Sequence, residues 1–491
     1  MATQETKQEN NTMKKVGISM CVITLLCFAF LGLMIFKLNM LPFKLLLIMI
    51  VGMGIVMVLD IILLCGNLGK GAFGVGVFLS LLCIIVSAIG GVYIIKTTKA
   101  LKGITSAGKE TAKISVFVLN DSGIDDISVL DGANFGIEGT MDRVNTDDAV
   151  NKIMNDKSIQ INALSYEGLD SLADALRNGE VNAIILNEGY LDVYRDSQGY
   201  ESFPDEIKVI SCEEIVSEVD ESEKKDIDFD NEYFAVYVSG IDTDGPVSCK
   251  SRSDVNIIAY VNIKSKQILL VSTPRDYFIP LSISDGNRDK LTHAGIYGVD
   301  VSMDTLGMLY DEKIEHYFRL NFTGFKTIID ELGGINVVSD YDFSTPNYSY
   351  TTGENFLYGE AALEFARERY SFEDGDNQRG KNQMKVITAV ISKATSPAIL
   401  KNYSSILKSL DGTFETSLSY DSISKLVKMQ LDKGGSWEIS SYSVTGFDSS
   451  STTYSINQNL YVMEPDYTSV ETAKKLIDQL KRGEKVEVPE Q

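Results

Sequence analysis

Three long apolar stretches stand out in the hydrophobic pattern of the chain, at about residues 16–36, 45–65 and 75–95. Each is close to the roughly 20 residues that a helix needs to cross the hydrocarbon core of a bilayer. The first and third contain no charged residue, and the second contains only Asp60. Buried core helices rarely run this long without a polar residue, and a cleaved signal peptide would not be followed by two more such stretches. We therefore predict a membrane module with three transmembrane helices over residues 1–103.

The lysines around these stretches do not decide the orientation of the helices. If the N-terminus is cytoplasmic, four lysines lie inside and five outside, so neither side has the excess that marks cytoplasmic loops. Three spans do place the two termini on opposite sides of the membrane. Asp60 lies near the end of its stretch, and we expect its side chain to reach the membrane interface.

Residues 112–222 show shorter apolar runs in an alternating order. The pattern predicts strands at 114–119, 159–163 and 181–186, with helices at 147–154 and 171–177. Strands that alternate with helices indicate a small α/β domain. This region has no glycine-rich phosphate loop and no metal-binding motif, so we interpret it as an accessory domain. The acid-rich residues 213–230 are expected to form a solvated linker.

Residues 232–470 show a second, larger α/β pattern, which predicts a central mixed sheet flanked by helices. The expected strands are 234–238, 255–261, 268–272 and 335–338, and the expected helices are 322–332, 359–367 and one beginning at 376. Met384, Ile387 and Ile391 are expected to be the core-facing stripe of that last helix. Further helices are predicted at 403–410 and 422–431, and an amphipathic helix at 468–482. We expect residues 471–491 to form a C-terminal helix and tail.

Charge and composition exclude several functions. The first 103 residues have nine lysines and three acids, whereas the rest of the chain has 36 basic and 65 acidic residues. A surface this acidic repels nucleic acid, so no nucleic-acid partner is expected. The chain has only two histidines, which makes a histidine-based zinc site or a Ser-His-Asp triad improbable. Cys212 and Cys249, the two cysteines outside the apolar region, form either two free thiols or one disulfide.

Charged residues gather at the ends of two predicted neighbouring strands. Arg252 and Asp254 precede the strand at 255–261, while Arg275 and Asp276 follow the strand at 268–272. In a hairpin, these positions come to the same end. Asp242 follows the strand at 234–238, in the position where α/β folds place ligands.

A second basic group lies further along the chain. Arg367 and Arg369 are two residues apart at a helix end, and Arg379 and Gln383 are four apart on one helical face. The planar guanidinium group suits phosphate oxygens. Carboxylates near such a group are ligands for Mg²⁺, which binds one or two carboxylates together with substrate phosphates. The pattern therefore predicts a site that handles a pyrophosphate.

These residues resemble the motifs of the LytR-CpsA-Psr family of cell-envelope proteins, and its capsule-associated branch most closely. The shared motifs are residues 239–243, 251–254, 272–276, 321–325, 332–334, 366–369 and 376–383. They follow the family's order over about residues 234–395. The three apolar stretches and the domain that precedes the core also resemble the capsule-associated branch.

The resemblance implies a phosphotransferase that lies outside the cytoplasmic membrane. Such enzymes move a glycopolymer, here a capsular polysaccharide or a similar anionic polymer, from a polyprenyl-pyrophosphate carrier to peptidoglycan. An apolar tunnel would hold the lipid. The implied Mg²⁺ ligands are Asp242 and Asp254, and the implied pyrophosphate-binding residues are Arg252, Arg275, Arg367, Arg369, Arg379, Lys381 and Gln383. Lys381 stands where the family often has arginine.

The chemistry of phosphoryl transfer needs positioning and charge neutralisation more than a nucleophilic side chain. Arg252, Asp254, Arg275 and Asp276 are the candidate catalytic residues. The general base stays open between Asp254, Asp276 and the substrate itself. Three other functions remain as alternatives: a scaffold that binds polyprenyl lipids, a transcriptional attenuator, and a pyrophosphate hydrolase. The acidic soluble part and the lack of a helix-turn-helix motif count against the attenuator.

Overall fold

The computed structural model describes residues 2–489 except 39, 67, 106–108, 219–225, 242–246, 374 and 397–412. The chain forms two compact units. One unit comprises residues 1–103 with 419–435, and the other comprises residues 104–418 with 436–491. Each unit is described by itself below.

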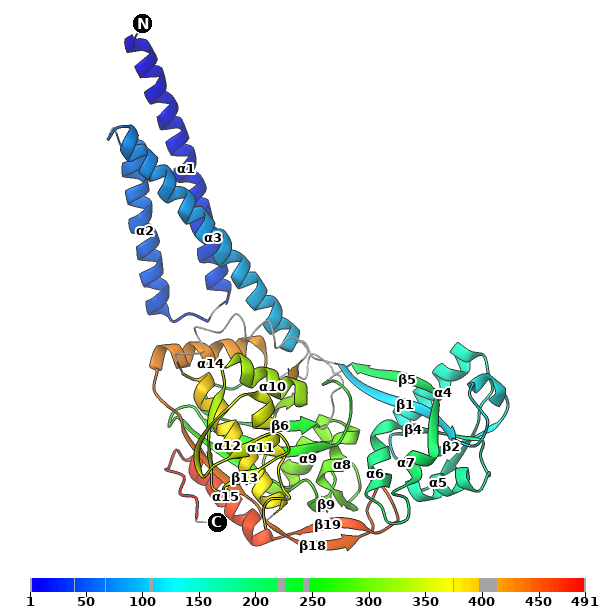
Figure 1. The fold of residues 1–491 in the computed structure, drawn as a ribbon. Coiled ribbons are helices and arrows are strands. Elements are labelled where there is room, and N and C mark those ends of the chain that lie inside the picture. Colours follow the sequence, from blue (N-terminus) through cyan, green and yellow to red (C-terminus); the bar gives the residue numbers. More distant parts are fainter. Residues whose placement is uncertain are drawn as a thin grey trace. The chain divides into compact units, whose positions relative to one another are not determined.

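The first unit contains the three predicted long apolar helices, labelled in Figure 1: α1 (Ala2–Leu38), α2 (Phe43–Cys65) and α3 (Lys70–Thr105). Each contains a segment of 23 or 27 residues that is long and apolar enough to cross a membrane. Helix α14 (Tyr420–Lys433) belongs to the same unit, and the Tyr420 hydroxyl donates a hydrogen bond to the Leu38 carbonyl oxygen at 3.0 Å.

The Asp60 side chain lies among the helices of this unit. Its side chain is fully buried and accepts a hydrogen bond from the Ser80 hydroxyl of α3. A carboxylate inside an apolar helix bundle is costly unless a polar partner satisfies it. The neighbouring helix supplies a partner for one of the two carboxylate oxygens, which the pattern of α2 alone does not indicate.

The second unit begins with a five-stranded sheet in the order β3-β2-β4-β1-β5. Its strands are β1 (Lys109–Leu119), β2 (Asn134–Glu138), β3 (Asn162–Tyr166), β4 (Ala183–Asn187) and β5 (Ile207–Glu218). Helix α4 (Arg143–Lys157) packs on one face, and α5 (Leu169–Arg177) packs on the other. The short helices α6 (Leu191–Arg195) and α7 (Phe203–Glu206) lead into β5. The predicted small α/β domain is therefore present.

Some of its predicted boundaries are wrong. Helix α4 begins at residue 143 instead of 147, β3 begins at 162 instead of 159, and β2 was not predicted. The predicted linker starts inside β5, which pairs with β1 along its whole length. The ladder of backbone hydrogen bonds to β1 decides the conformation there, although the sequence is acidic. Residues 219–225 of the predicted linker lie outside the described residues.

A larger six-stranded sheet follows in the order β16-β11-β6-β7-β8-β17. Its strands are β6 (Tyr233–Ile241), β7 (Ser253–Asn262), β8 (Gln267–Ser272), β11 (His316–Leu320), β16 (Phe414–Thr416) and β17 (Glu438–Ser443). The pairs β6–β11 and β8–β17 are parallel, and the other pairs are antiparallel. This is the predicted mixed sheet.

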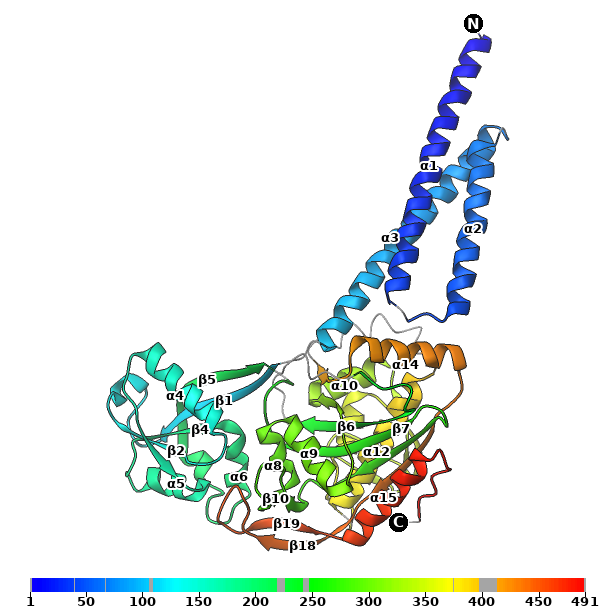
Figure 2. The same ribbon diagram turned by 180° about the vertical axis from the view of Figure 1, so that it is seen from behind.

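Helices cover both faces of this sheet (Figures 1 and 2). Alternate side chains of each strand point to opposite faces. Tyr237 and Ile258 join a core with α9 (Val299–Tyr310) and α15 (Tyr467–Lys481). Residues 470–480 of α15 belong to that core, so the expected division after residue 470 falls inside a helix that completes the domain.

The opposite face is covered by α10 (Phe322–Glu331), α11 (Gly359–Arg367) and α12 (Asp376–Ala394). Gly333 and Gly334 end α10 with positive φ angles of 75° and 82°, a conformation that favours glycine. A Cβ atom on Gly380 would lie 3.1 Å from the Ser272 hydroxyl, so α12 packs closely over the end of β8. The predicted helix at 403–410 lies outside the described residues.

Short elements surround the sheet. The paired strands are β9 (Phe278–Pro280) with β10 (Arg288–Lys290), β12 (Ile335–Ser339) with β15 (Gly353–Leu357), β13 (Phe343–Ser344) with β14 (Ser349–Tyr350), and β18 (Gly446–Ser451) with β19 (Leu460–Pro465). Helix α8 (Leu291–Tyr297) follows β10. The β9–β10 and β18–β19 pairs matter for the site because they lie beside the segment that follows β8.

Candidate functional site

The β7–β8 hairpin brings Asp254 and Arg275 together as predicted. Ile257 pairs with Ser272, so the start of β7 and the end of β8 lie at the same edge of the sheet. The Arg275 Nη1 atom is 3.0 Å from each Asp254 carboxylate oxygen. Thr292 of α8 also donates to Asp254, at 3.3 Å. The hairpin therefore holds one arginine and one carboxylate in a defined arrangement.

Asp276 lies behind Arg275 and is more deeply buried. It accepts a hydrogen bond from Arg275 Nε at 3.3 Å and forms an ion pair with Lys290 Nζ at 3.0 Å. Burial by itself would raise the pKa of Asp276, but the charges of Lys290 and Arg275 outweigh it and hold that pKa below its ordinary value. Burial likewise opposes the charge on Arg275, and Asp254 and Asp276 together raise its pKa above the ordinary value. The site is an ion network in which Arg275 stays charged.

This network predicts a pH-dependent contribution of Asp276 to stability. A carboxyl whose pKa is lower in the folded than in the unfolded protein stabilises the fold at neutral pH. That contribution disappears as the pH falls through the folded value. We expect the melting temperature of wild type to exceed that of Asp276→Asn at pH 7, and the gap to shrink below about pH 4. Thermal unfolding between pH 7 and pH 3 measures it. Asp311→Asn, at a carboxylate that is 78% exposed, should show a smaller gap. A gap that is constant with pH would contradict the assignment.

Four further predicted residues share a cavity of about 810 Å³ with Asp254 and Arg275: Arg367, Arg369, Arg379 and Gln383. The Arg367 guanidinium lies over the Phe322 ring at 4.2 Å, and that of Arg369 over the Tyr370 ring at 4.7 Å. Aromatic rings support guanidinium groups in this way. Arg367 of α11, Arg379 of α12, Arg369 from the segment between these helices and Arg275 thus line a single cavity.

Most of the remaining lining is apolar, although Glu360, Glu364 and Glu368 also border the cavity, which lies between the sheet and helices α10 to α12. Strands β6, β7 and β11 contribute one wall, through Val236, Val238, Ala259, Phe318 and Leu320. The helices contribute the other wall, with Phe325, Ile328, Leu363, Val386, Ile387, Val390 and Ile391. A cavity that combines a cluster of arginines with a largely apolar wall suits an amphipathic ligand.

Two residues of the predicted core stripe on α12 belong to this cavity. Met384 is buried as predicted, but Ile387 and Ile391 are half-buried and line the apolar wall. The prediction that they pack in the core is wrong. Helical spacing shows that Gln383, Ile387 and Ile391 share a face, but it does not show that the face borders a cavity.

Arg252 is not among the residues that line the cavity. Its two terminal nitrogens each lie 3.1 Å from a carboxylate of the small domain, Asp192 or Asp196. The predicted hairpin convergence holds for Asp254 and Arg275 but does not bring Arg252 to them. Its partners lie about 60 residues earlier in the sequence, within and directly after helix α6 of the small domain, so the local pattern gave no indication of this pairing.

One other predicted residue, Lys381, also lies apart from the cavity. Lys381 lines a different hollow, of about 410 Å³, with Tyr442, Thr445 and Asp466. Its position on α12 is turned away from that of Arg379 and Gln383. Asp242 lies outside the described residues. Cys212 and Cys249 are both free thiols.

Asp254 has the chemistry of the predicted Mg²⁺ ligand. Its carboxylate lines the cavity together with four arginines, and carboxylate oxygens are what Mg²⁺ prefers. Within the described ranges, no three His, Cys, Asp or Glu side chains cluster as a metal site. That arrangement is compatible with Mg²⁺, because this ion takes few protein ligands and completes its shell with phosphates and water.

Lys290, Thr292 and Asp196 are polar residues at this site that the sequence patterns missed. Lys290 is 3% exposed and lies at the end of β10, where it contacts Asp276 at 3.0 Å and Asp196 at 3.5 Å. A lysine is almost never this buried unless it is paired. The only available signal was the short polar segment between two apolar runs, which is equally typical of a turn.

The chain matches the model of the LytR_cpsA_psr family over residues 206–479. It is 36% identical over 220 residues to the polyisoprenyl-teichoic acid–peptidoglycan teichoic acid transferase TagU of Enterococcus faecalis, covering 44% of this chain and 72% of that protein. Identity to TagU of Bacillus licheniformis is 33% over 208 residues, 41% of this chain and 67% of the relative. The crystal structure of B. subtilis TagV matches with a TM-score of 0.44 and 28% identity, over 52% of this chain and 99% of that one.

The chain therefore belongs to the LytR_cpsA_psr family. Membership of this family, which the motifs indicated, is confirmed. The matched region contains β6 to β19 and all the residues of the charged cavity described above. The three apolar helices and most of the small domain precede it.

Proposed function

We propose that this protein transfers a glycopolymer from a polyprenyl-pyrophosphate carrier to peptidoglycan. The observation that carries the proposal is the single cavity that joins a cluster of arginines to a long apolar wall. A polyprenyl pyrophosphate has the same division, because a charged diphosphate is attached to a hydrocarbon chain. Relatives of the chain are named as transferases of teichoic acid from a polyisoprenyl carrier to peptidoglycan. The proposed cargo is a capsular polysaccharide or a similar anionic glycopolymer.

In the proposed reaction, a peptidoglycan hydroxyl attacks the phosphorus nearest the polymer. A bond forms between the hydroxyl oxygen and that phosphorus, and the bond from the phosphorus to the bridging oxygen breaks. Polyprenyl phosphate leaves, and the polymer stays joined to peptidoglycan by a phosphodiester. Hydrolysis by water would follow the same route as a side reaction. The charge that develops on the phosphate oxygens needs positioned cations more than covalent chemistry.

The residues of the site would have different roles in this reaction. Arg275, Arg367, Arg369 and Arg379 would bind the pyrophosphate oxygens, and Gln383 would donate a further hydrogen bond. Asp276 has a lowered pKa, which makes it a weak proton acceptor and suits a positioning role behind Arg275. Asp254 or the substrate would then accept the proton of the attacking hydroxyl. Asp254, with Asp242 as the second predicted ligand, would hold Mg²⁺, whose charge would further neutralise the phosphates.

We also propose that the large C-terminal part lies outside the cytoplasmic membrane. Three helices are long and apolar enough to span, and the proposed acceptor is found outside the cell. Cys212 is an exposed free thiol of that part. Its labelling by a membrane-impermeant maleimide on intact, wall-digested cells would support this placement, whereas labelling only after lysis would contradict it.

The test of the transferase function uses the full chain in lipid nanodiscs. A short polyprenyl-pyrophosphoryl oligosaccharide is the donor, and peptidoglycan fragments are the acceptor. We expect polyprenyl phosphate to be released with Mg²⁺ and not with a chelator, and the oligosaccharide to appear on the acceptor. Tight donor binding without release would reject the transferase and favour a lipid-binding scaffold. Release without any joined product would favour a hydrolase.

A further inference from the structure

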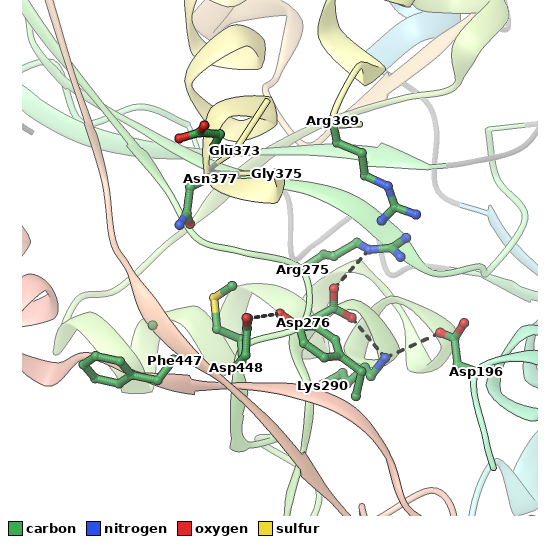
Figure 3. Close-up of a pocket in the computed structure, with 13 residues that line it drawn as sticks. Asp196, Arg275, Asp276, Lys290, Arg369, Glu373, Gly375, Asn377, Phe447 and Asp448 are labelled. Atoms are coloured by element: carbon green, nitrogen blue, oxygen red, sulfur yellow. Dashed lines mark hydrogen bonds and ion pairs between the residues drawn. The ribbon is translucent and has the colours of Figure 1, made fainter. Parts of the chain in front are cut away.

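A second cavity, of about 670 Å³, adjoins the charged end of the first (Figure 3). The two cavities share Arg275 and Arg369. Their other linings differ, because the second has no aliphatic wall. Its size falls within the range of roughly 300–1,000 Å³ that is common for small-molecule sites. A further ligand group can therefore lie next to the pyrophosphate on the side away from the lipid.

One wall of this second cavity comes from the β18–β19 hairpin. Asp448 pairs with Met463, and Ser450 pairs with Tyr461, so Asp448, Tyr461 and Met463 lie on one face of the hairpin. The Tyr461 hydroxyl donates to the Asp448 carboxylate at 2.7 Å. The Tyr461 ring is 42% exposed, and its centre lies 5.9 Å from the Lys290 ammonium. This wall combines an exposed aromatic ring and a thioether with a carboxylate.

The remaining walls come from two other parts of the unit. Glu373 precedes α12 and Asn377 lies in its first turn, and both stand above Arg275 in Figure 3. Asp196 reaches the cavity from the small domain, where its carboxylate lies 3.1 Å from Arg252 and 3.5 Å from Lys290. These ion pairs fix the small domain at the edge of the cavity. The small domain is thus part of the wall and not only a spacer.

We propose that this second cavity binds the saccharide of the peptidoglycan acceptor, and that the small domain forms part of the site through Asp196. This inference rests on the transferase function proposed above. Saccharides present apolar ring faces together with hydroxyl and acetamido edges. A tyrosine ring and a methionine beside carboxylates and an amide match both surfaces.

The geometry of the transfer reaction indicates that the acceptor occupies the second cavity. In phosphoryl transfer, the attacking and leaving oxygens lie roughly in line through the phosphorus. The leaving lipid phosphate would extend into the apolar cavity. The attacking hydroxyl must therefore approach from the opposite side of the shared arginines, which is where the second cavity lies.

The test measures binding of an acceptor fragment to the full chain in nanodiscs. The probe is the disaccharide-peptide that a muramidase releases from peptidoglycan, and calorimetry measures its affinity without any donor. We expect Tyr461→Ala to weaken binding about tenfold, as for an aromatic side chain at the centre of an interface. Tyr461→Phe should bind more tightly than Tyr461→Ala, since it keeps the ring. Asp448→Ala removes a surface carboxylate and should weaken binding severalfold. This second variant tests the site independently if Tyr461→Ala misfolds.

The matched control is Tyr358→Ala. The Tyr358 ring is 56% exposed and lies outside the residues that line either cavity. This variant should bind the fragment as wild type does. In the transfer assay, Tyr461→Ala should raise the KM for the acceptor more than the KM for the donor.

The outcomes separate this site from the transferase function. Unchanged fragment affinity in both Tyr461→Ala and Asp448→Ala would overturn the acceptor site while transfer could still occur. A rise confined to the donor KM would place the donor's first sugar in the cavity and would also overturn it. Tyr461-dependent fragment binding in a protein that releases no polyprenyl phosphate would support the site and reject the transferase reaction.

Discussion

Replacing Arg275 with alanine should lower the rate of polymer transfer at least 100-fold, as removal of one positioned charge-stabilising donor does in other enzymes. Arg275 is shared by both cavities and contacts Asp254 and Asp276. Removing it therefore takes a cation from the point where the phosphate charge would develop. The measurement is the initial rate of polyprenyl phosphate release under saturating donor.

Arg275→Lys is the companion variant. It keeps the charge but loses the planar fork that can contact two oxygens, so we expect an intermediate rate. Removing one partner of a buried ion pair can also destabilise the fold, and thermal unfolding of both variants must be compared with the rates. Arg482→Ala is the control, because Arg482 is exposed and pairs with Glu484. A folded Arg275→Ala protein that retains a tenth or more of the wild-type rate would reject the site.

Partly filling the apolar cavity should reduce transfer from long-chain donors more than transfer from short-chain donors. Ile387 lines this cavity from α12, and Ile387→Trp would place a larger side chain in the space proposed for the lipid. We expect kcat/KM for a long-chain polyprenyl donor to fall about tenfold or more, since hydrophobic pockets distinguish small differences in fit by roughly 10- to 200-fold. A short-chain donor should be affected much less. Transfer assays with two donors that differ only in chain length measure the ratio.

Ser392→Trp is the matched control for this variant. Ser392 is exposed on the same helix and does not line the cavity. It adds the same side chain without reducing the space. Equal losses with the long and the short donor in Ile387→Trp would mean that the cavity does not hold the lipid, and that the variant acts by distorting α12.

Several features of the site followed from spacing alone. Asp254 precedes one strand of the β7–β8 hairpin and Arg275 follows the other, which predicted that they would meet, and they do, at 3.0 Å. The four-residue spacing of Arg379 and Gln383 predicted a shared helical face, and both line one cavity. The alternation of side chains along a strand and the periodicity of a helix are local properties, so they do not depend on which segments pack around them.

Other features needed the packed structure. Arg252 appeared equivalent to Arg275 in the sequence, but its charge is taken by Asp192 and Asp196 of the small domain. Lys290 showed no recognisable pattern, and the fold buries it between Asp276 and Asp196. An ion pair depends on where two segments far apart in the sequence meet in space. The periodicity of a single helix or strand does not contain that information.

By itself, the sequence of this protein determined three spanning helices, a mixed sheet with helices on both faces, and the edge of that sheet where the charged residues meet. These follow from the length of apolar runs, from side-chain alternation and from turn residues, all of which act between near neighbours in the chain. Only the tertiary structure decided that Ile387 and Ile391 border a cavity instead of a core, and that the small domain closes a second cavity through Asp196. Periodicity states which side chains share a face, but what covers that face depends on the packing of segments far apart in sequence.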